Sequence, residues 1–406
     1  MIDPLIIVGG GQAACSCGFK LRELGYKGPI LMVSAEDSLP YHRPPLSKKY
    51  LPGDIERNSL LIKPASLYQD DQIEVKLGTF VTRIDRSLRH IVLDTGEVLP
   101  YQTLVLATGA RARKLPSDQG GEGSNVFTLR TLDDADKLRP HMQPEQSLLI
   151  VGGGYIGLEM AAVARKLGLK VTLIELSERL LNRVASAETA AYFKSLHESH
   201  EVEICEKTGI ESVSRAGDKV VSVTLTSGKQ LNVDLVIVGI GVEVNNGIAK
   251  EAGLTTGLGI EVDETGRTSD PCIYAVGDCA SFKFRGQTVR IESIQNAVDQ
   301  AEAVARSIVD PCARYQPYPW FWSDQYDTKL QTAGLNIGYT KVVYRKSKKR
   351  SDAASIWYFD DHRLLAVDAI NEPATFMIAK SLLKAGGDLD PDHLESVDNL
   401  RTLLKV

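Results

Sequence analysis

The chain has 406 residues, enough for two or three domains that each have their own hydrophobic core. Hydrophobic residues make up 43% and charged residues 24% of it, which is typical of a globular protein. The net charge of −5 argues against nucleic acid as a partner, and no apolar run approaches the roughly 20 residues that span a bilayer. Because the first strand is expected almost at Met1, no room is left for a signal peptide. We therefore expect a cytoplasmic protein that binds neither nucleic acid nor membrane.

The spacing of the cysteines indicates neither a redox pair nor a zinc site. The six of them form no C-x-x-C pair and no zinc spacing. Cys15 and Cys17 lie two apart on a predicted helix and so face different directions. We expect reduced, structural thiols and no metal site.

The first motif in the chain is a glycine fingerprint that follows an apolar strand. Residues 5–8 are predicted to form this strand, and residues 9–14, Gly-Gly-Gly-Gln-Ala-Ala, fit the pattern G-x-G-x-x-G/A. The first glycine makes a tight turn, the second lets the backbone approach a pyrophosphate, and the last small residue packs the helix on the strand. A helix to about Leu24 and a strand over 29–33 complete the βαβ unit. Glu36 follows, placed to accept a hydrogen bond from an adenosine ribose.

A second copy of the fingerprint lies in the middle of the chain. Residues 148–151 form the strand, and residues 152–157 read Gly-Gly-Gly-Tyr-Ile-Gly. A helix to about Leu167 and a strand that ends at Glu175 follow, and a carboxylate there repels the 2′-phosphate of NADPH, which favours NADH. Two copies imply two dinucleotides in one protein, an arrangement that is mostly used to pass electrons between them.

Later segments suggest a duplicated fold with an added domain. The apolar runs at 104–110 and 235–241 look like matching strands that close the two units, and 274–278 is a further buried strand. Past Pro311, aromatic residues cluster at 318–322, and short alternating segments then predict antiparallel strands. The sequence thus predicts an α/β protein with two Rossmann-like dinucleotide-binding domains and a C-terminal α+β domain.

Taken together, these segments resemble the FAD-dependent, NADH-linked ferredoxin reductases of bacterial oxygenase systems. The specific motifs are Arg-Pro-Pro-Leu-Ser-Lys at 43–48 and Trp-Phe-Trp-Ser-Asp-Gln at 320–325. The resemblance implies a glutathione-reductase-like fold in three parts. These are a discontinuous FAD domain (1–112 and 246–318), an NADH domain (113–245) and a C-terminal domain (319–406).

The resemblance also implies a set of FAD-binding positions. Arg43 and Lys48 are expected along the flavin with Arg130 nearby, and Asp278 on the ribityl chain. A plain surface loop is the alternative for Arg43 and Lys48, and a helix N-cap is the alternative for Asp278. The full set is Gly9, Gly11, Ala13, Ala14, Glu36, Arg43, Lys48, Val81, Ala107, Thr108, Gly109, Arg130, Gly277, Asp278, Ile294 and Trp320.

The NAD-binding positions follow in the same way. Arg183 goes with NADH in the resembling proteins, although a nearby arginine could also tolerate a 2′-phosphate. Tyr155 is expected near the flavin ring until nicotinamide displaces it, with ordinary packing as the alternative. The full set is Gly152, Gly154, Tyr155, Ile156, Gly157, Glu159, Glu175, Arg183, Gly239, Ile240 and Gly241.

Four residues are predicted to form the reaction centre. By resemblance, Lys48 and Glu159 pair beside the flavin and orient the nicotinamide, while Trp320 and Trp322 lie on the side where an iron–sulfur partner docks. A carboxylate favoured by the helix dipole is the alternative for Glu159. Core packing is the alternative for the two tryptophans, since residues two apart on a strand share one face.

The implied partner is a small iron–sulfur ferredoxin, of the two-iron or the Rieske type. This ferredoxin would pass electrons to a mono-oxygenase or to a ring-hydroxylating dioxygenase, and the sequence does not choose between the two. The reductase itself is expected to be a monomer or a weak homodimer. A disulfide or peroxide reductase of the same fold is one alternative, but residues 39–49, where such enzymes carry a redox cysteine, contain none. An NADH-sensing flavoprotein with a signalling partner is the other.

Overall fold

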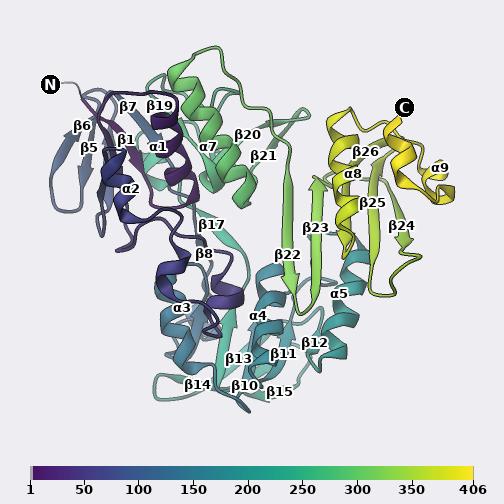
Figure 1. Ribbon diagram of the computed structural model, residues 1–406. Helices are drawn as coiled ribbons and strands as arrows, with labels where there is room; N and C mark the ends of the chain where they lie inside the picture. Colours follow the sequence, from purple (N-terminus) through teal and green to yellow (C-terminus); the bar gives the residue numbers. More distant parts are fainter. Residues whose placement is uncertain (1–2, 406) are drawn as a thin grey trace. The chain divides into compact units, whose positions relative to one another are not determined.

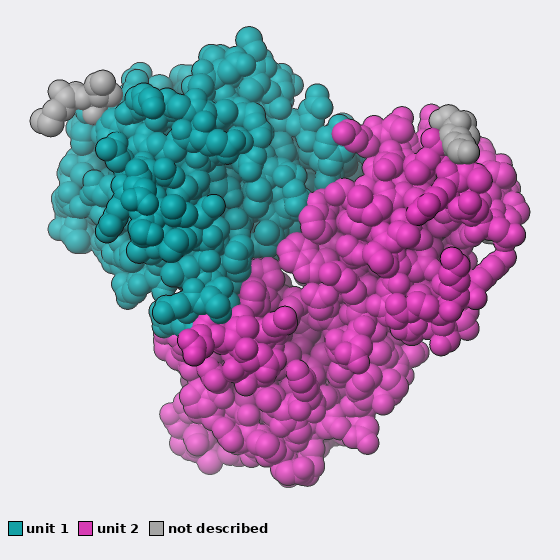
Figure 2. Space-filling view, viewed as in Figure 1, with its two compact units in different colours: residues 1–42, 57–111, 243–319 teal, residues 43–56, 112–242, 320–406 magenta. Residues whose placement is uncertain are grey.

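The computed structural model describes residues 3–405, which form two compact units (Figure 2). The first unit comprises the ranges 1–42, 57–111 and 243–319, and the second comprises 43–56, 112–242 and 320–406. The expected division into three domains stays a prediction. In this two-unit division, the segment 43–56 belongs with the second unit.

A parallel five-stranded sheet organises the first unit. Its central strands are short, wholly apolar and buried, as expected for a parallel sheet that is covered on both faces. The strands, in spatial order, are β19 (Ile273–Ala275), β7 (Thr103–Leu106), β1 (Leu5–Val8), β2 (Ile30–Val33) and β3 (Ile73–Lys76).

Two helices of this unit pack side by side, α1 (Gln12–Glu23) and α7 (Ile294–Val309) (Figure 1). Their buried residues are mostly small, including Ala14, Ala297 and Ala301, which lets the two backbones approach closely. The other elements of the unit are η2 (Arg57–Leu60), α2 (Ala65–Asp70), β4 (Val81–Asp85), β5 (His90–Leu93), β6 (Val98–Pro100), α6 (Gly247–Glu251), β18 (Ile260–Glu261), η5 (Gly277–Cys279), β20 (Ala280–Phe284) and β21 (Gln287–Val289).

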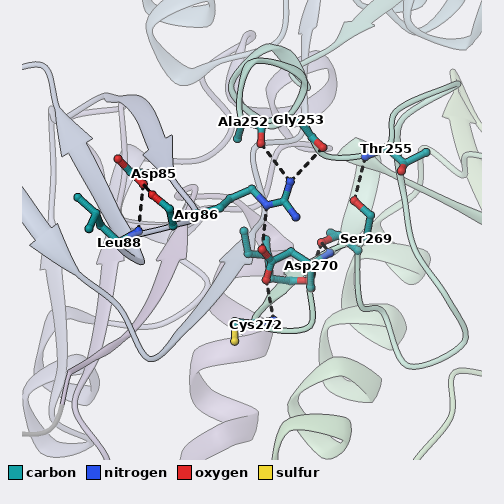
Figure 3. Close-up of polar contacts among 12 residues, drawn as sticks. Asp85, Arg86, Leu88, Ala252, Gly253, Thr255, Ser269, Asp270 and Cys272 are labelled. Atoms are coloured by element: carbon teal, nitrogen blue, oxygen red, sulfur yellow. Dashed lines mark hydrogen bonds and ion pairs between the residues drawn. The ribbon is translucent and has the colours of Figure 1, made fainter.

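Arg86 joins three separate stretches of the first unit (Figure 3). Its Nε donates to Asp270 Oδ2 at 2.8 Å, and its Nη1 donates to the carbonyls of Ala252 and Gly253. Those two carbonyls follow α6, so the cation satisfies acceptors that the helix end leaves unpaired. This contact fixes the β4–β6 sheet to the chain that enters β19.

The second unit also contains a parallel five-stranded sheet. Its strands, in spatial order, are β9 (Val126–Thr128), β16 (Leu235–Val238), β10 (Ser147–Val151), β11 (Lys170–Ile174) and β12 (Glu203–Cys205). Four strands have the same order as in the first sheet, while the edge strand β9 precedes the fingerprint strand in the chain and its counterpart β19 follows it. The fingerprint strand β10 is central, as β1 is in the first unit. The two sheets therefore support the prediction of a duplicated unit.

Helices and a smaller sheet surround this second parallel sheet. They include α4 (Tyr155–Lys166), which follows the fingerprint, and α5 (Ala187–Ser199), which follows β11. The remaining elements are η1 (Leu46–Tyr50), η3 (Ser117–Gln119), α3 (Leu132–Leu138), η4 (Arg139–His141), β13 (Ile210–Ala216), β14 (Lys219–Leu225) and β15 (Gln230–Asn232). The strands β8 (Ala110–Ala112) and β17 (Val242–Val244) form a two-stranded ribbon whose residues are divided between the two units.

The C-terminal part of the second unit is an antiparallel sheet with a covering helix (Figure 1). The strands, in spatial order, are β22 (Trp320–Gln325), β23 (Thr328–Gly334), β26 (Arg363–Ile370), β25 (Ala354–Asp360) and β24 (Lys341–Lys346). Helix α8 (Pro373–Lys384) packs on β23 and β26, and α9 (Pro391–Ser396) and η6 (Leu400–Lys405) complete the chain. The predicted fold class, two Rossmann-like units with a C-terminal α+β part, is confirmed.

Candidate functional site

In the glycine turn after β1, one glycine packs closely against a neighbouring strand end and another leaves free space around its backbone. Gly9 has a φ of +136°, and a Cβ on it would lie 2.2 Å from the carbonyl oxygen of Ala107. No side chain fits there, so the turn rests directly on the residue that follows β7. Gly11, in contrast, has no atom within 4 Å of a built Cβ, which leaves its backbone open to a ligand.

The second fingerprint repeats this construction. A Cβ on Gly152 would lie 2.5 Å from the carbonyl oxygen of Gly239, the residue after β16, while Gly154 again has nothing within 4 Å. Gly157 packs tightly, since a Cβ there would meet the carbonyl oxygen of Gly152 at 2.0 Å. In both copies the first glycine is tight and the third is open, while the tight Gly157 corresponds to Ala14 in the first copy, where a Cβ fits. Both turns therefore suit a pyrophosphate at a helix N-terminus.

Polar atoms without partners lie beside the first fingerprint and fit a bound dinucleotide. Gly277, with a φ of +74°, approaches Ala13 closely, and its N–H donates to Gln300 Oε1 at 2.8 Å. Gln300 Nε2 and Gln12 Oε1 are buried and have no hydrogen-bond partner among the described residues. Buried amides are normally satisfied, so a ligand with donors and acceptors, such as FAD, suits this place.

Each second strand is followed by a carboxylate, but the two are held differently. Glu175 accepts from the N–H groups of Gly153 and Ser177, both at 2.7 Å, which fixes it beside the second fingerprint. Glu36 lies three residues beyond β2, and its Oε2 accepts from the buried hydroxyl of Tyr41. Both acids lie where a ribose hydroxyl is expected in this fold.

The arginines near Glu175 are directed elsewhere. Arg183 Nη2 lies 3.2 Å from a Cβ built on Gly241, so its guanidinium covers the glycine turn after β16. Arg179 donates to the carbonyls of Leu180, Ala185 and Ser186. Neither contact directs a cation at the Glu175 carboxylate.

The other predicted positions of the first unit follow its strands and begin its last helix. Thr108 Oγ1 donates to the carbonyl of Asn245, and Asn245 Nδ2 donates back to the carbonyl of Thr108, which fixes the turn after β7. The remaining positions are Val81 at the start of β4, Gly109 after β7, Asp278 in η5 and Ile294 at the start of α7. Ile240 follows β16 in the second unit.

The Arg-Pro-Pro-Leu-Ser-Lys motif leads into a π-helical turn in the second unit. Pro45 begins this turn, and the N–H of Tyr50 donates to the Pro45 carbonyl, an i→i−5 bond that widens the turn. Arg43 Nη1 donates to the carbonyl of Arg130, so two predicted flavin-side residues are in contact. The widened turn presents Ser47 and Lys48 together.

A buried carboxylate, Glu159 on α4, is the centre of this region. Its side chain is only 3% exposed, and Lys48 Nζ lies 2.8 Å from its Oε2. Ser47 Oγ donates to the same oxygen at 2.8 Å, and Ser323 Oγ donates to Oε1 at 2.7 Å. The predicted pair of Lys48 and Glu159 is thus formed, and two serines complete it.

The two serines were missed in the sequence, although a signal for one of them was present. The strand β22 alternates, so Trp320 and Trp322 share one face while Phe321, Ser323 and Gln325 share the other. The sequence led us to assign a function only to the face that carries Trp320 and Trp322. On the opposite face, Ser323 contacts Glu159 and Gln325 contacts Ser323.

The tryptophan face is packed against α8. Trp320 lies edge-on to Phe376, with ring centroids 5.8 Å apart, and Lys380 Nζ lies 5.1 Å from the centroid of its ring. Trp322 lies 5.5 Å from Trp320. The roles of Trp320 and Trp322 beside the flavin stay predictions.

Tyr155 is tied to the C-terminal sheet. Its ring lies 4.6 Å from that of Phe321, and its hydroxyl lies near Thr332, whose Oγ1 donates to Asp368 at 2.6 Å. Burial raises the pKa of the Tyr155 hydroxyl well above its usual value. Tyr155 therefore remains a neutral hydroxyl, held at the start of α4.

The buried cysteines of the first unit are poor nucleophiles. Burial raises the pKa of Cys15 to about 11 and that of Cys17 to about 12, so both stay protonated near neutral pH. All six cysteines carry free thiols. The geometry does not favour the alternative of a disulfide or peroxide reductase.

Two dinucleotide cradles and a buried ion pair define a nucleotide-dependent reductase, and comparison with known proteins agrees. Residues 3–301 match the family described as pyridine nucleotide-disulphide oxidoreductase, and residues 320–404 match the one described as reductase C-terminal. The chain therefore belongs to the pyridine nucleotide-disulphide oxidoreductase family.

Its relatives are ferredoxin reductases. The chain is 41% identical to rhodocoxin reductase of Rhodococcus erythropolis, over 97% of this chain and 92% of the relative. It is 39% identical to putidaredoxin reductase CamA of Pseudomonas putida, over 97% and 94% respectively. These relatives confirm the prediction of an FAD- and NAD-linked ferredoxin reductase.

Solved structures support the same assignment. The reductase in the covalent complex of putidaredoxin reductase with putidaredoxin matches with a TM-score of 0.95 and 38% identity, over 100% of this chain and 99% of that one. The ferredoxin reductase for the CYP199A2 system from Rhodopseudomonas palustris matches equally, over 99% and 100%. Within residues 3–405, no helix has the length and apolar character needed to cross a bilayer. Among the described residues there is also no group of three or more His, Cys, Asp or Glu side chains that could hold a metal ion.

Burial of His197 predicts a pH-dependent stability of the second unit. His197 on α5 is fully buried, its Nε2 lies 2.8 Å from Gln325 Oε1, and burial lowers its pKa from 6.5 to about 4. The unfolded chain therefore binds one more proton between these two pKa values, so stability is complete above pH 6.5 and is lost as the pH falls towards 4. From pH 7.5 to pH 5 this one group should cost about 2 kcal/mol.

Urea unfolding followed by tryptophan fluorescence measures this loss, because all three tryptophans lie in β22 and β25. His197→Gln removes the titrating group and should show a smaller loss between the same two pH values. Equal losses in the wild type and the variant would contradict the assignment.

Proposed function

We propose that this chain takes electrons from NADH, through bound FAD, to a small iron–sulfur ferredoxin of the two-iron or Rieske type. The observation that carries the proposal is the pair of similarly built glycine turns, each with a tight first glycine and an open third glycine, since two open cradles suit two dinucleotides. Bound FAD would supply the chemistry that links NADH, a donor of two electrons, to an iron–sulfur cluster that accepts one, because FAD accepts two electrons together and releases them singly. The protein's own contribution is to bind, orient and shield.

The two cradles receive different nucleotides in this proposal. Gly9, Gly11, Ala13 and Ala14 hold FAD, supported by the unpartnered amide atoms of Gln12 and Gln300. The Gly152–Gly157 turn holds NADH. We also propose a cytoplasmic location, where NADH is supplied and thiols stay reduced, and a monomer or weak homodimer.

Lys48 and Glu159 are proposed to orient the nicotinamide. Glu159 lies on the first turns of α4, directly after the second fingerprint, so it projects from the helix that receives the NADH pyrophosphate. Lys48 neutralises its charge, and Ser47 and Ser323 saturate its oxygens. A carboxylate held in this way has a fixed position, which a positioning group needs.

We propose that the ferredoxin does not dock on the basic segment 341–350, which precedes β25. Lys341 pairs with Asp392, Lys348 with Asp398, and Arg350 with Asp352, so the acids of this unit already neutralise much of that segment. Paired charges attract a partner weakly. We therefore propose that the ferredoxin presents acidic groups and that basic groups elsewhere on this chain attract it.

The first prediction tests the function itself. With NADH and purified protein, cytochrome c reduction should require added two-iron ferredoxin, and its rate at limiting ferredoxin should fall several-fold between about 0.05 and about 0.5 M salt. Ferricyanide reduction, which needs no docked protein, should change little over that range. Rapid cytochrome c reduction without ferredoxin, or NADH-dependent reduction of a disulfide or peroxide, would overturn the proposal.

The second prediction concerns Glu159. Replacement by alanine removes the group that orients the nicotinamide, so Glu159→Ala should slow single-turnover flavin reduction by NADH by about 100-fold. The visible absorbance of bound FAD should be unchanged, because Glu159 lies on the helix of the second fingerprint. Glu188→Ala, which removes an exposed carboxylate from α5, is the matched control and should react at the wild-type rate.

The third prediction concerns the choice between NADH and NADPH. Glu175→Gln keeps an acceptor for the Gly153 N–H but removes the charge that repels a 2′-phosphate. The ratio of kcat/KM for NADH to that for NADPH should fall by about tenfold, which is about 1.4 kcal/mol. Glu178→Gln, an exposed acid in the same loop, should leave the ratio unchanged. An unchanged ratio in Glu175→Gln would remove Glu175 from this role.

A further inference from the structure

A chain of buried polar side chains leads away from Glu159 along β22. Ser323, Gln325 and His197 each have no measurable exposure, and Glu159 is 3% exposed. Four adjoining polar groups are thus withdrawn from water in one place. Buried polar groups are costly unless their hydrogen bonds are complete, so the pattern of bonds within the chain can be deduced.

The distances connect these groups in series. Ser323 Oγ lies 2.7 Å from Glu159 Oε1, and Gln325 Nε2 lies 3.2 Å from Ser323 Oγ. Gln325 Oε1 lies 2.8 Å from His197 Nε2, and Tyr326 Oη lies 3.4 Å from His197 Nδ1. Three parts of the second unit contribute: α4, α5 and the C-terminal strand with its turn.

The carboxylate sets the direction of every bond in the series. Glu159 can only accept, so the Ser323 hydroxyl donates to it and is itself available to accept from the Gln325 amide. The Gln325 oxygen then accepts from the N–H at His197 Nε2, which leaves Nδ1 as an acceptor for the Tyr326 hydroxyl. All the donors therefore point towards Glu159, and such an aligned series strengthens its last bond.

We propose that Ser323 and Gln325 are positioning residues for Glu159, held in register by neutral His197. The proposal rests on the proposed role of Glu159 in orienting nicotinamide. Ser47 and Lys48 both engage Oε2, so Ser323 is what fixes Oε1 and with it the plane of the carboxylate. Gln325 keeps the Ser323 hydroxyl turned towards Glu159 and away from other acceptors.

The proposal gives the C-terminal sheet two roles on two faces of one strand. The Trp320 and Trp322 face packs against α8, while the Ser323 and Gln325 face supplies donors to the reaction centre. Burial lowers the pKa of His197 to about 4, so the ring stays neutral near neutral pH and Nδ1 is left as an acceptor. The series carries no net proton transfer, since the Gln325 amide interrupts any relay.

The experiment compares single-turnover flavin reduction by NADH in FAD-loaded variants. Ser323→Ala removes a hydrogen bond to a charged group, so the limiting rate should fall about tenfold while the half-saturating NADH concentration changes little. Gln325→Met keeps the bond from Ser323 to Glu159 but loses the bonds of Gln325 to Ser323 and to His197, so it should show a smaller loss than Ser323→Ala. Ser323→Thr, which keeps the hydroxyl, should restore most of the rate. Ser355→Ala, which removes another buried serine of the same sheet, is the control and should react normally.

A double variant separates a positioning role from a structural one. If Ser323 acts through Glu159, adding Ser323→Ala to Glu159→Ala should cost nothing further, whereas independent effects would multiply. A wild-type rate in Ser323→Ala, or multiplied effects in the double variant, would overturn this inference alone. A wild-type rate in Glu159→Ala would instead overturn the proposed role of Glu159.

Discussion

A buried negative charge organises the second unit. Glu159 lies almost entirely out of water, a position that costs several kcal/mol unless the charge is paired and both oxygens are hydrogen-bonded. Lys48 and Ser47 come from the segment 43–56, and Ser323 comes from the C-terminal sheet. Three stretches far apart in sequence must therefore meet at one carboxylate, and the π-helical turn at Leu46–Tyr50 is the local device that presents two of the donors. The same requirement makes the site rigid.

Duplication explains the two parallel sheets. Each half places a short buried strand in the centre of a parallel sheet and ends it in a glycine that touches the residue after a neighbouring strand, Ala107 in one half and Gly239 in the other. A side chain at Gly9 or Gly152 would push the strands apart, so these positions depend on packing within the protein. Gly11 and Gly154 have free space around them, which is the part of the pattern that a nucleotide uses. The tightly packed glycines thus have a structural role, and the glycines with free space around them are the ones available to a ligand.

The sequence predicted the elements that depend on local patterns. The fingerprint strands and their helices were found, because apolar runs and glycine spacing lie within a few residues of each other. The Lys48–Glu159 pair joins residues far apart in the chain and was expected only from the resemblance to a known family. Ser323, Gln325 and His197 were not found, since their importance arises only when β22 lies along α4 and α5. Two-residue alternation along β22 did separate the faces, but the sequence does not reveal which face meets a charge. Isolated serine and glutamine residues carry no signal of their own.

The central claim is that Glu159 is a charged carboxylate, although buried, because three donors hold it. Infrared difference spectroscopy between the FAD-loaded wild type and Glu159→Gln at neutral pH tests this claim directly, since one carboxyl group is the main difference between the two samples. The account predicts that the wild type shows the paired stretching bands of an ionised carboxylate that the variant lacks. The carbonyl stretch of a protonated acid in their place would contradict it.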